Sequence, residues 1–153
     1  MPDPIHVSGL QDHLGYWLRY VSNQVSHAFS LKVAAREVTV AEWVVLRELY
    51  EQDAMVPSAL AERLGMTRGA ISKLADRLAA KALLTRVPGK TDRRYQDLAL
   101  TTAGRALVPE LSDLADQNDA EFFGRLLPED RAAIRRLMMD IVRQLGLRTT
   151  PVD

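Results

Sequence analysis

Residues 60–74, LAERLGMTRGAISKL, predict two short helices that meet at a glycine-containing turn. Ser58, after Pro57, is the expected start of the first helix, and Gly65 is its expected end because glycine readily adopts the left-handed conformation that closes a helix. Thr67 is a good N-cap for the second helix. This arrangement is typical of a helix-turn-helix, whose second helix is narrow enough to enter the major groove of DNA.

The second helix of this pair has one apolar and one polar face. The side chains expected to face the core recur at helical spacing: Ile71, Leu74, Ala75 and Leu78. The other faces present groups that suit a DNA groove: Thr67, Arg68, Gly69, Ser72, Lys73 and Arg77. Cations and hydroxyls bond to base edges or phosphates, and glycine allows close approach of the backbone. Asp76 is the exception, and we expect Lys73 or Arg77 to screen it, or a cytosine amino group to donate to it. A plain solvated face is the alternative interpretation.

After residue 83 the spacing of the apolar residues changes from that of a helix to that of a strand. Residues 84–87 and 95–101 predict two strands, and residues 88–94 predict the turn between them. Four cations lie on or near this turn and suit a narrow minor groove: Arg86, Lys90, Arg93 and Arg94. Asp92 is expected to pair with a neighbouring guanidinium and aim it; the alternative is a surface ion pair worth under ~1 kcal/mol.

Charge is distributed unevenly along the chain. The 153 residues contain 20 Lys and Arg and 20 Asp and Glu, so the formal net charge is zero. Residues 56–105 nevertheless hold ten basic and four acidic side chains, a net charge of +6, which leaves −6 for the remainder. A basic middle between acidic ends favours a polyanion as the partner of the middle segment.

Composition excludes several classes of protein. A hydrophobic content of 47% and a charged content of 26% indicate an ordinary globular chain with a single domain. The absence of cysteine excludes disulfide scaffolds, zinc fingers, thiol nucleophiles and cysteine-based oxidant sensing. No apolar run approaches the ~18 residues needed to span a bilayer, and residues 1–9 do not resemble a secretory signal, so we expect a cytoplasmic protein without a membrane partner.

Long helices are expected on both sides of this middle segment. Apolar spacing from Leu10 to Phe29 predicts one long first helix. Thr39 and Glu42 predict a second helix with a reciprocal cap, in which each side chain accepts the backbone N–H of the other residue. Residues 102–126 predict a fifth helix, and Pro128 opens a sixth that Gly146 ends.

The turn and the sequence after it resemble a known family. Residues 92–94, Asp-Arg-Arg, followed by LALTTAGRAL at residues 98–107, look like the Asp-x-Arg wing and the strand-to-helix junction of the MarR family of bacterial winged-helix regulators. The helix-turn-helix, the entry to the second helix at residues 39–46 and the long terminal helices are similar in order and length. The resemblance therefore covers nearly the whole chain.

The resemblance implies a mainly α fold with a small β-hairpin wing, in which one domain spans residues 1–153. Residues 36–101 would form the winged helix-turn-helix lobe that binds DNA, and residues 8–35 and 102–147 the helical region through which two copies form a homodimer. Amphipathic spacing agrees, because these helices carry more apolar surface than so small a domain hides alone. The interface candidates are Leu10, Leu14, Phe122, Phe123, Leu137, Met138, Ile141 and Leu145. Packing within one chain is the alternative.

The resemblance also implies control by a small molecule, often an aromatic acid or a phenol bound between the dimer helices and the DNA-binding lobes. Five residues provide aromatic walls and a cation for a carboxylate: His13, Trp17, Tyr20, Trp43 and Arg47. Core packing is the alternative for the two tryptophans. No cofactor or metal is expected, because His6, His13 and His27 lack ligand spacing, and no catalytic set is evident.

The resulting hypothesis is a homodimeric regulator of transcription, in most cases a repressor, that binds double-stranded promoter DNA at a pseudo-palindromic site. An effector would lower its DNA affinity by holding the two lobes at the wrong spacing. The alternatives are a winged-helix protein-interaction module that docks an acidic partner, and a small-molecule-binding enzyme.

Overall fold

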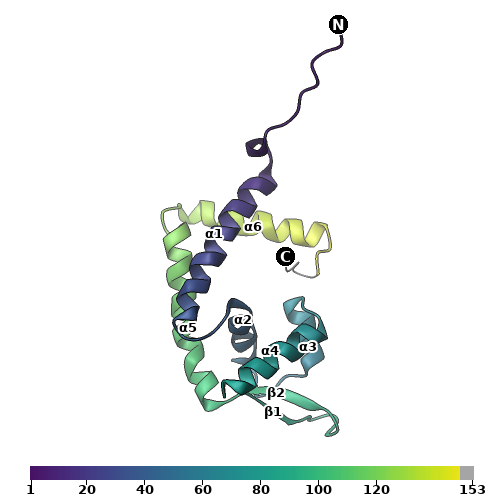
Figure 1. The fold of residues 1–153 in the computed structure, drawn as a ribbon, viewed down its shortest axis with the longest axis vertical. Coiled ribbons are helices and arrows are strands. Elements are labelled where there is room, and N and C mark those ends of the chain that lie inside the picture. Colours follow the sequence, from purple (N-terminus) through teal and green to yellow (C-terminus); the bar gives the residue numbers. More distant parts are fainter. Residues whose placement is uncertain (149–153) are drawn as a thin grey trace.

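The computed structural model describes residues 1–148, which form six α-helices and one two-stranded hairpin. The elements in chain order are η1 (Leu10–Asp12), α1 (Leu14–Ala34), α2 (Val40–Leu49), α3 (Pro57–Leu64), α4 (Arg68–Ala80), β1 (Leu84–Pro88), β2 (Gln96–Leu100), α5 (Thr102–Phe123) and α6 (Pro128–Gln144). Helices α2, α3 and α4 and the hairpin form a lobe at one end of α5, and α6 leaves the other end (Figure 1). The predicted helical fold with a hairpin wing is confirmed.

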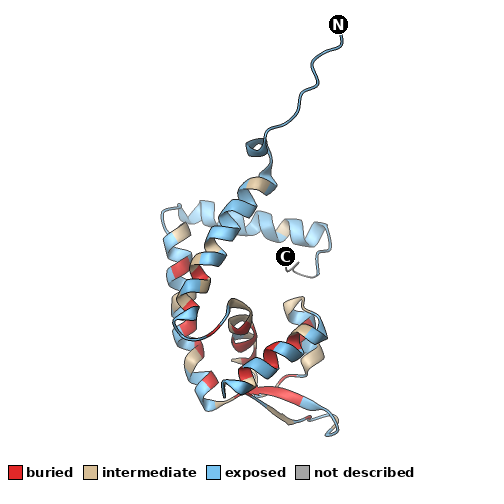
Figure 2. Cartoon of the chain, viewed as in Figure 1, coloured by how far each residue is buried: buried red, intermediate tan, exposed pale blue. Residues whose placement is uncertain are grey.

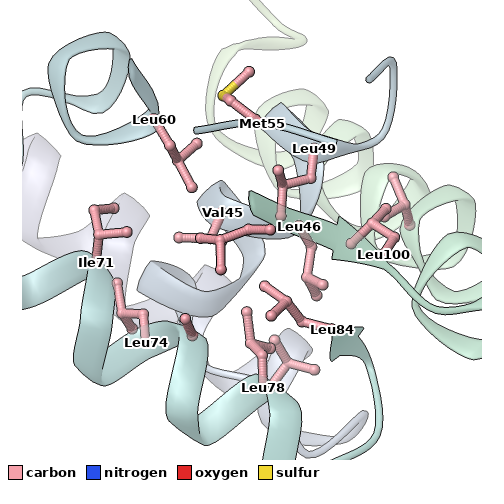
Figure 3. Close-up of a cluster of buried hydrophobic side chains, with 14 of the residues drawn as sticks. Val45, Leu46, Leu49, Met55, Leu60, Ile71, Leu74, Leu78, Leu84 and Leu100 are labelled. Carbon is pink, nitrogen blue, oxygen red and sulfur yellow. The ribbon is translucent and has the colours of Figure 1, made fainter. Parts of the chain in front are cut away.

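The core lies in this lobe and extends to the adjoining parts of α1 and α5. Leu46 and Leu49 of α2 are fully buried between α3, α4 and the strands (Figure 3). The four apolar side chains predicted to face inward from α4 are all buried: Ile71, Leu74, Ala75 and Leu78. Their burial fixes the rotation of α4 about its axis, and so determines which of its side chains face outward.

The turn between α3 and α4 is built as the sequence predicts. Gly65 has a φ of 64°, the left-handed conformation that closes α3. Thr67 Oγ1 accepts the Ala70 N–H at 3.1 Å and caps α4. Two residues, Gly65 and Met66, thus separate the end of one helix from the cap of the next.

The hairpin is anchored to the lobe by a third short strand segment that the sequence analysis missed. Strands β1 and β2 are antiparallel, with Leu84 opposite Leu100 and Pro88 opposite Gln96. Met55 pairs with Leu98 through two backbone hydrogen bonds of 2.8 and 2.9 Å. One bridging residue has no periodicity, so no pattern in the sequence could reveal it.

The first helix starts later than predicted. Leu10 belongs to the separate 3-10 turn η1, and His13 is extended between that turn and α1. The Asp12 carboxylate accepts the Gly9 N–H at 2.8 Å, and His13 Nδ1 lies 2.9 Å from the Gly9 carbonyl oxygen. These local side-chain bonds compete with a helix. The prediction of one continuous helix from Leu10 is therefore wrong in its first turn.

Two predicted helix starts also need correction. Thr39 Oγ1 accepts the Glu42 N–H at 3.1 Å, but the Glu42 carboxylate turns away from the cap and bonds Lys81 Nζ. Only half of the reciprocal cap forms, because the carboxylate is buried and takes a charged partner there. Helix α3 begins at Pro57, before Ser58, since proline has no N–H to satisfy and its φ already suits a first turn.

The long helices leave much apolar surface uncovered. Helix α6 buries none of its residues, and the outer half of α1 is exposed as well (Figure 2). Within residues 1–148, no helix is both long and apolar enough to cross a membrane.

Replacing Gly104 by alanine is expected to lower the free energy of unfolding by about 1 to 3 kcal/mol. A Cβ atom at Gly104, in the first turn of α5, would overlap the backbone carbonyl of Leu83. That carbonyl also accepts the Thr101 N–H at 3.1 Å and has little freedom to move. Urea unfolding at fixed protein concentration measures the change. The control is Gly15→Ala, because a Cβ atom at Gly15 meets nothing; equal midpoints for both variants would contradict the close approach.

Candidate nucleic-acid interface

The outward face of α4 carries the residues predicted to contact DNA. Six of them are exposed: Thr67, Arg68, Gly69, Ser72, Lys73 and Arg77. A Cβ atom at Gly69 would meet nothing closer than Thr67 Oγ1 at 4.0 Å, so the packing of the chain does not require glycine there. A glycine in an exposed helix costs about 1 kcal/mol relative to alanine. Close approach of an outside partner would explain its presence.

The tip of the wing presents its cations around an internal ion pair. Arg94 Nη2 and Nε donate to the Asp92 carboxylate at 2.9 and 3.1 Å, and the Arg94 backbone N–H donates to the same group at 3.0 Å. The side chain of Arg94 is still 85% exposed. Asp92 thus pairs with a neighbouring guanidinium, as expected, and Lys90 and Arg93 lie exposed beside the pair.

The Asp92–Arg94 pair is stable over the neutral pH range. The side-chain hydrogen bond from Arg94, followed by its backbone N–H, lowers the pKa of Asp92 below its usual value of 3.8. The same pair raises the pKa of Arg94. Because a lowered carboxyl pKa favours the ionised form, the pair is present above pH 3.8 and is lost only as the pH falls through the lowered value. The Asp92–Arg94 ion pair is therefore expected to persist between pH 5 and 8.

The base of the wing is tied to the outward face of α4. Arg86 Nη2 of β1 donates to Asp76 Oδ1 of α4 at 2.7 Å. The sequence predicted Lys73 or Arg77 as the cation that screens Asp76. That prediction is wrong, because the cation bonded to Asp76 is Arg86. The β-hairpin brings Arg86 back over α4, a placement that helical spacing alone does not show.

Two further anchors hold α4 and the wing in place, and the sequence analysis did not find them. Lys81 Nζ, just after α4, bonds both Glu42 carboxylate oxygens at 2.8 and 3.1 Å and the Glu37 carbonyl oxygen. Arg105, at the start of α5, donates to the carbonyl oxygens of Tyr50 and Gln52 at the end of α2. The partners are far apart in the chain, so no local motif marks them.

The lobe that carries these features also matches a known protein family. Residues 37–94, which include α2, α3, α4, β1 and the turn of the hairpin but not β2, match the model described as the MarR family. Outside this segment too, the chain is similar to members of that family. The resemblance noted in the sequence is thereby confirmed.

The chain is similar to several named regulators. It is 39% identical over 67 residues to the HTH-type transcriptional repressor MdtR of Bacillus subtilis, a match that covers 44% of this chain and 43% of that protein. It is 25% identical over 120 residues to the multiple antibiotic resistance protein MarR of Escherichia coli, a match that covers 78% of this chain and 83% of that protein. The structure of BpsR from Bordetella bronchiseptica is described as explaining regulation of its DNA binding by 6-hydroxynicotinic acid. It aligns with this chain with a TM-score of 0.80 and 28% sequence identity. The alignment covers 89% of this chain and 97% of BpsR.

Within one subunit, the five residues predicted to bind an effector do not converge. Trp43 packs edge-on against Phe29, with ring centroids 6.3 Å apart. Trp17 lies twelve residues before Phe29 on α1, which is about 18 Å along a helix. Arg47 pairs with Glu51 at 3.0 Å. His13 and Tyr20 are exposed near the start of α1, so the effector site stays a prediction that needs a second subunit to close it.

The predicted interface residues lie on or next to the uncovered helices. Six are exposed: Leu10, Leu14, Leu137, Met138, Ile141 and Leu145. Phe122 and Phe123, near the end of α5, are half-buried, with ring centroids 6.3 Å apart. A hollow between α5 and α6 is lined by Phe123, Leu126, Ile134 and Met138. These apolar groups sit at the end of α5 away from the wing (Figure 1).

Proposed function

We propose that this MarR-family chain is a transcriptional regulator, most simply a repressor, that binds specific promoter DNA as a homodimer. One observation carries the proposal: the exposed polar face of α4 and the cationic wing lie side by side, joined by the Asp76–Arg86 contact of 2.7 Å. A helix and a projecting cationic hairpin match the two grooves of one duplex. Because promoter DNA in bacteria lies in the cytoplasm, we extend the proposal to that compartment.

Each part of the surface has a proposed role. Arg68 and Lys73 would reach base edges or phosphates in the major groove, with Ser72 and Thr67 beside them. The wing tip would enter the adjacent minor groove through Lys90, Arg93 and Arg94. Arg77 would contribute positive charge at the edge of the surface, whereas Arg86 is paired with Asp76. The proposal contains no catalytic step, in keeping with relatives that are named as regulators.

Pairing of two subunits would account for the uncovered helices. Exposed apolar patches of this extent usually mark an interface. If α1, α5 and α6 of two chains pack about a twofold axis, two α4 helices face successive major grooves, about 34 Å apart, on a pseudo-palindromic site.

Control by a small effector would follow from the same geometry. A ligand that binds between the dimer helices and the lobes changes DNA affinity only if it favours one spacing of the two α4 helices. A difference of about 1 to 3 kcal/mol between the ligand's binding free energies for the two spacings shifts the DNA affinity five-fold or more. BpsR is described as regulated by 6-hydroxynicotinic acid, so we propose a small aromatic or phenolic acid as the ligand class.

The test is selection of bound duplexes from a random pool. A symmetric consensus with half-sites about one helical turn apart is the expected result. Salt titration on the selected duplex should give a log-log slope of about −0.9 per phosphate contact. A flat slope, or no binding to any duplex at low ionic strength, would instead favour a protein-interaction module that docks an acidic partner.

Arg94→Ala and Lys73→Ala are each expected to weaken binding to the selected duplex by about ten-fold to one hundred-fold, since each removes a charge-assisted contact worth about 1.5 to 3 kcal/mol. Helical content and dimer mass should not change, because both side chains are exposed. Arg136→Ala on α6 is the matched control: it removes one exposed cation away from the lobe. Fluorescence anisotropy measures the affinities, and wild-type binding by both lobe variants would remove these assignments.

A further inference from the structure

The contact between Asp76 and Arg86 has features that a simple surface ion pair lacks. Asp76 is the only acidic residue of α4, and it lies on the exposed face among the residues proposed to read DNA. It is three residues from Lys73 and four from Ser72, so the three side chains neighbour one another on the helix. A carboxylate in this position repels phosphates, whatever the sequence of the duplex.

Arg86 is correspondingly withdrawn from DNA. Its side chain is 32% exposed, against 69% for Asp76 and 85% for Arg94 at the wing tip. The guanidinium donates to the Asp76 carboxylate at 2.7 Å. One of the four wing cations is therefore neutralised by α4 itself, and the bond joins the base of the wing to the helix.

We propose that the Asp76–Arg86 pair determines specificity by lowering affinity for non-operator DNA more than affinity for the operator. Non-specific binding is almost wholly electrostatic, so a neutralised cation and an added carboxylate weaken it directly. Operator binding also depends on base contacts made in both grooves at once. These contacts need α4 and the wing in a fixed relative position, which the pair provides. This inference rests on the proposed DNA binding.

The experiment compares wild type, Asp76→Asn and the double variant Asp76→Asn/Arg86→Gln on two duplexes. One duplex carries the selected consensus, and the other has the same base composition in scrambled order. Affinity is measured for each over a series of salt concentrations. Asp76→Asn should bind the scrambled duplex about five-fold more tightly, with a log-log salt slope steeper by about 0.9, because one more cation reaches a phosphate. Its preference for the consensus should fall at least five-fold.

The double variant separates position from charge. It removes the pair but leaves the net charge of the lobe unchanged, so its affinity for the scrambled duplex should stay within about two-fold of wild type. Its preference for the consensus should still fall, since the wing is no longer tied to α4. Asp113→Asn, on the exposed face of α5, is the matched control for adding one positive charge elsewhere.

The outcomes are distinct. A steeper slope and lower preference for Asp76→Asn, with Asp113→Asn like wild type, support the inference. If wild type binds DNA but Asp76→Asn leaves the slope and the preference unchanged, or if Asp113→Asn has the same effect, the inference is overturned and DNA binding stands. If wild type binds neither duplex, the proposed function and the inference both fail.

Discussion

Replacing Leu137 and Ile141 together by glutamate is expected to convert the dimer into monomers and to abolish measurable binding to the selected duplex. The two side chains lie one helical turn apart on α6 and are 54% and 47% exposed in the single subunit. Burying such a side chain contributes about 1.5 to 3 kcal/mol. Each glutamate removes that gain and adds a carboxylate without a partner in the interface. Light scattering should report the mass of one subunit.

Loss of DNA binding follows from loss of the second lobe. Two lobes held in one dimer bind two half-sites with an avidity that exceeds single-lobe binding by about 10² to 10⁴. A folded monomer keeps α4 and the wing but has only one half-site contact. Circular dichroism should show unchanged helical content, because α6 buries nothing within its own chain.

Met139→Glu is the control for this variant. Met139 is also exposed on α6, but it lies two residues from both Leu137 and Ile141, about 200° around the helix. It should remain dimeric and bind DNA. A dimeric Leu137→Glu/Ile141→Glu variant would show that the face of α6 we propose is not the interface.

Replacing Lys81 by methionine is expected to lower the free energy of unfolding by about 3 kcal/mol. Glu42 is only 1% exposed, and both of its carboxylate oxygens bond Lys81 Nζ. Methionine leaves this buried charge unpaired and also removes the bond to the Glu37 carbonyl oxygen. The loss should be greater than for the exposed Lys73→Met, which has the same change of side chain and a solvated position.

The double variant Glu42→Gln/Lys81→Met tests the cause. If the unpaired carboxylate is responsible, removing its charge should recover most of the lost stability. Urea unfolding measures the free energy of unfolding of wild type and of the three variants. All four are measured at one protein concentration, since the stability of a dimer depends on concentration. Equal losses for Lys81→Met and Lys73→Met would contradict the proposed role of the buried pair.

The helix-turn-helix was predictable because its determinants are local. The apolar spacing from Ile71 to Leu78, the cap at Thr67 and the glycine at position 65 each act over four residues or fewer. The same is true of the Asp92–Arg94 pair, whose members are two residues apart. Interactions of this range can be inferred from the order of residues alone.

Two of the errors arose where a distant residue competed with a local pattern. Glu42 has the right spacing from Thr39 for a reciprocal cap, yet its carboxylate bonds Lys81, 39 residues away. Asp76 was assigned to neighbours on its own helix, yet it bonds Arg86 from the hairpin. In both cases a charged partner from another element gives a stronger interaction than the local one.

The sequence by itself determined the order of the helices, the inward face of α4, the hairpin and its cations, and the family, because periodicity, caps and turn residues are properties of short segments. Only the tertiary structure decided that Arg86 lies on Asp76, that Lys81 closes over Glu42, and that Met55 anchors the wing. These contacts join residues 10 to 43 positions apart. Their formation depends on how the helices pack together, and packing is a property of the whole core rather than of any one segment.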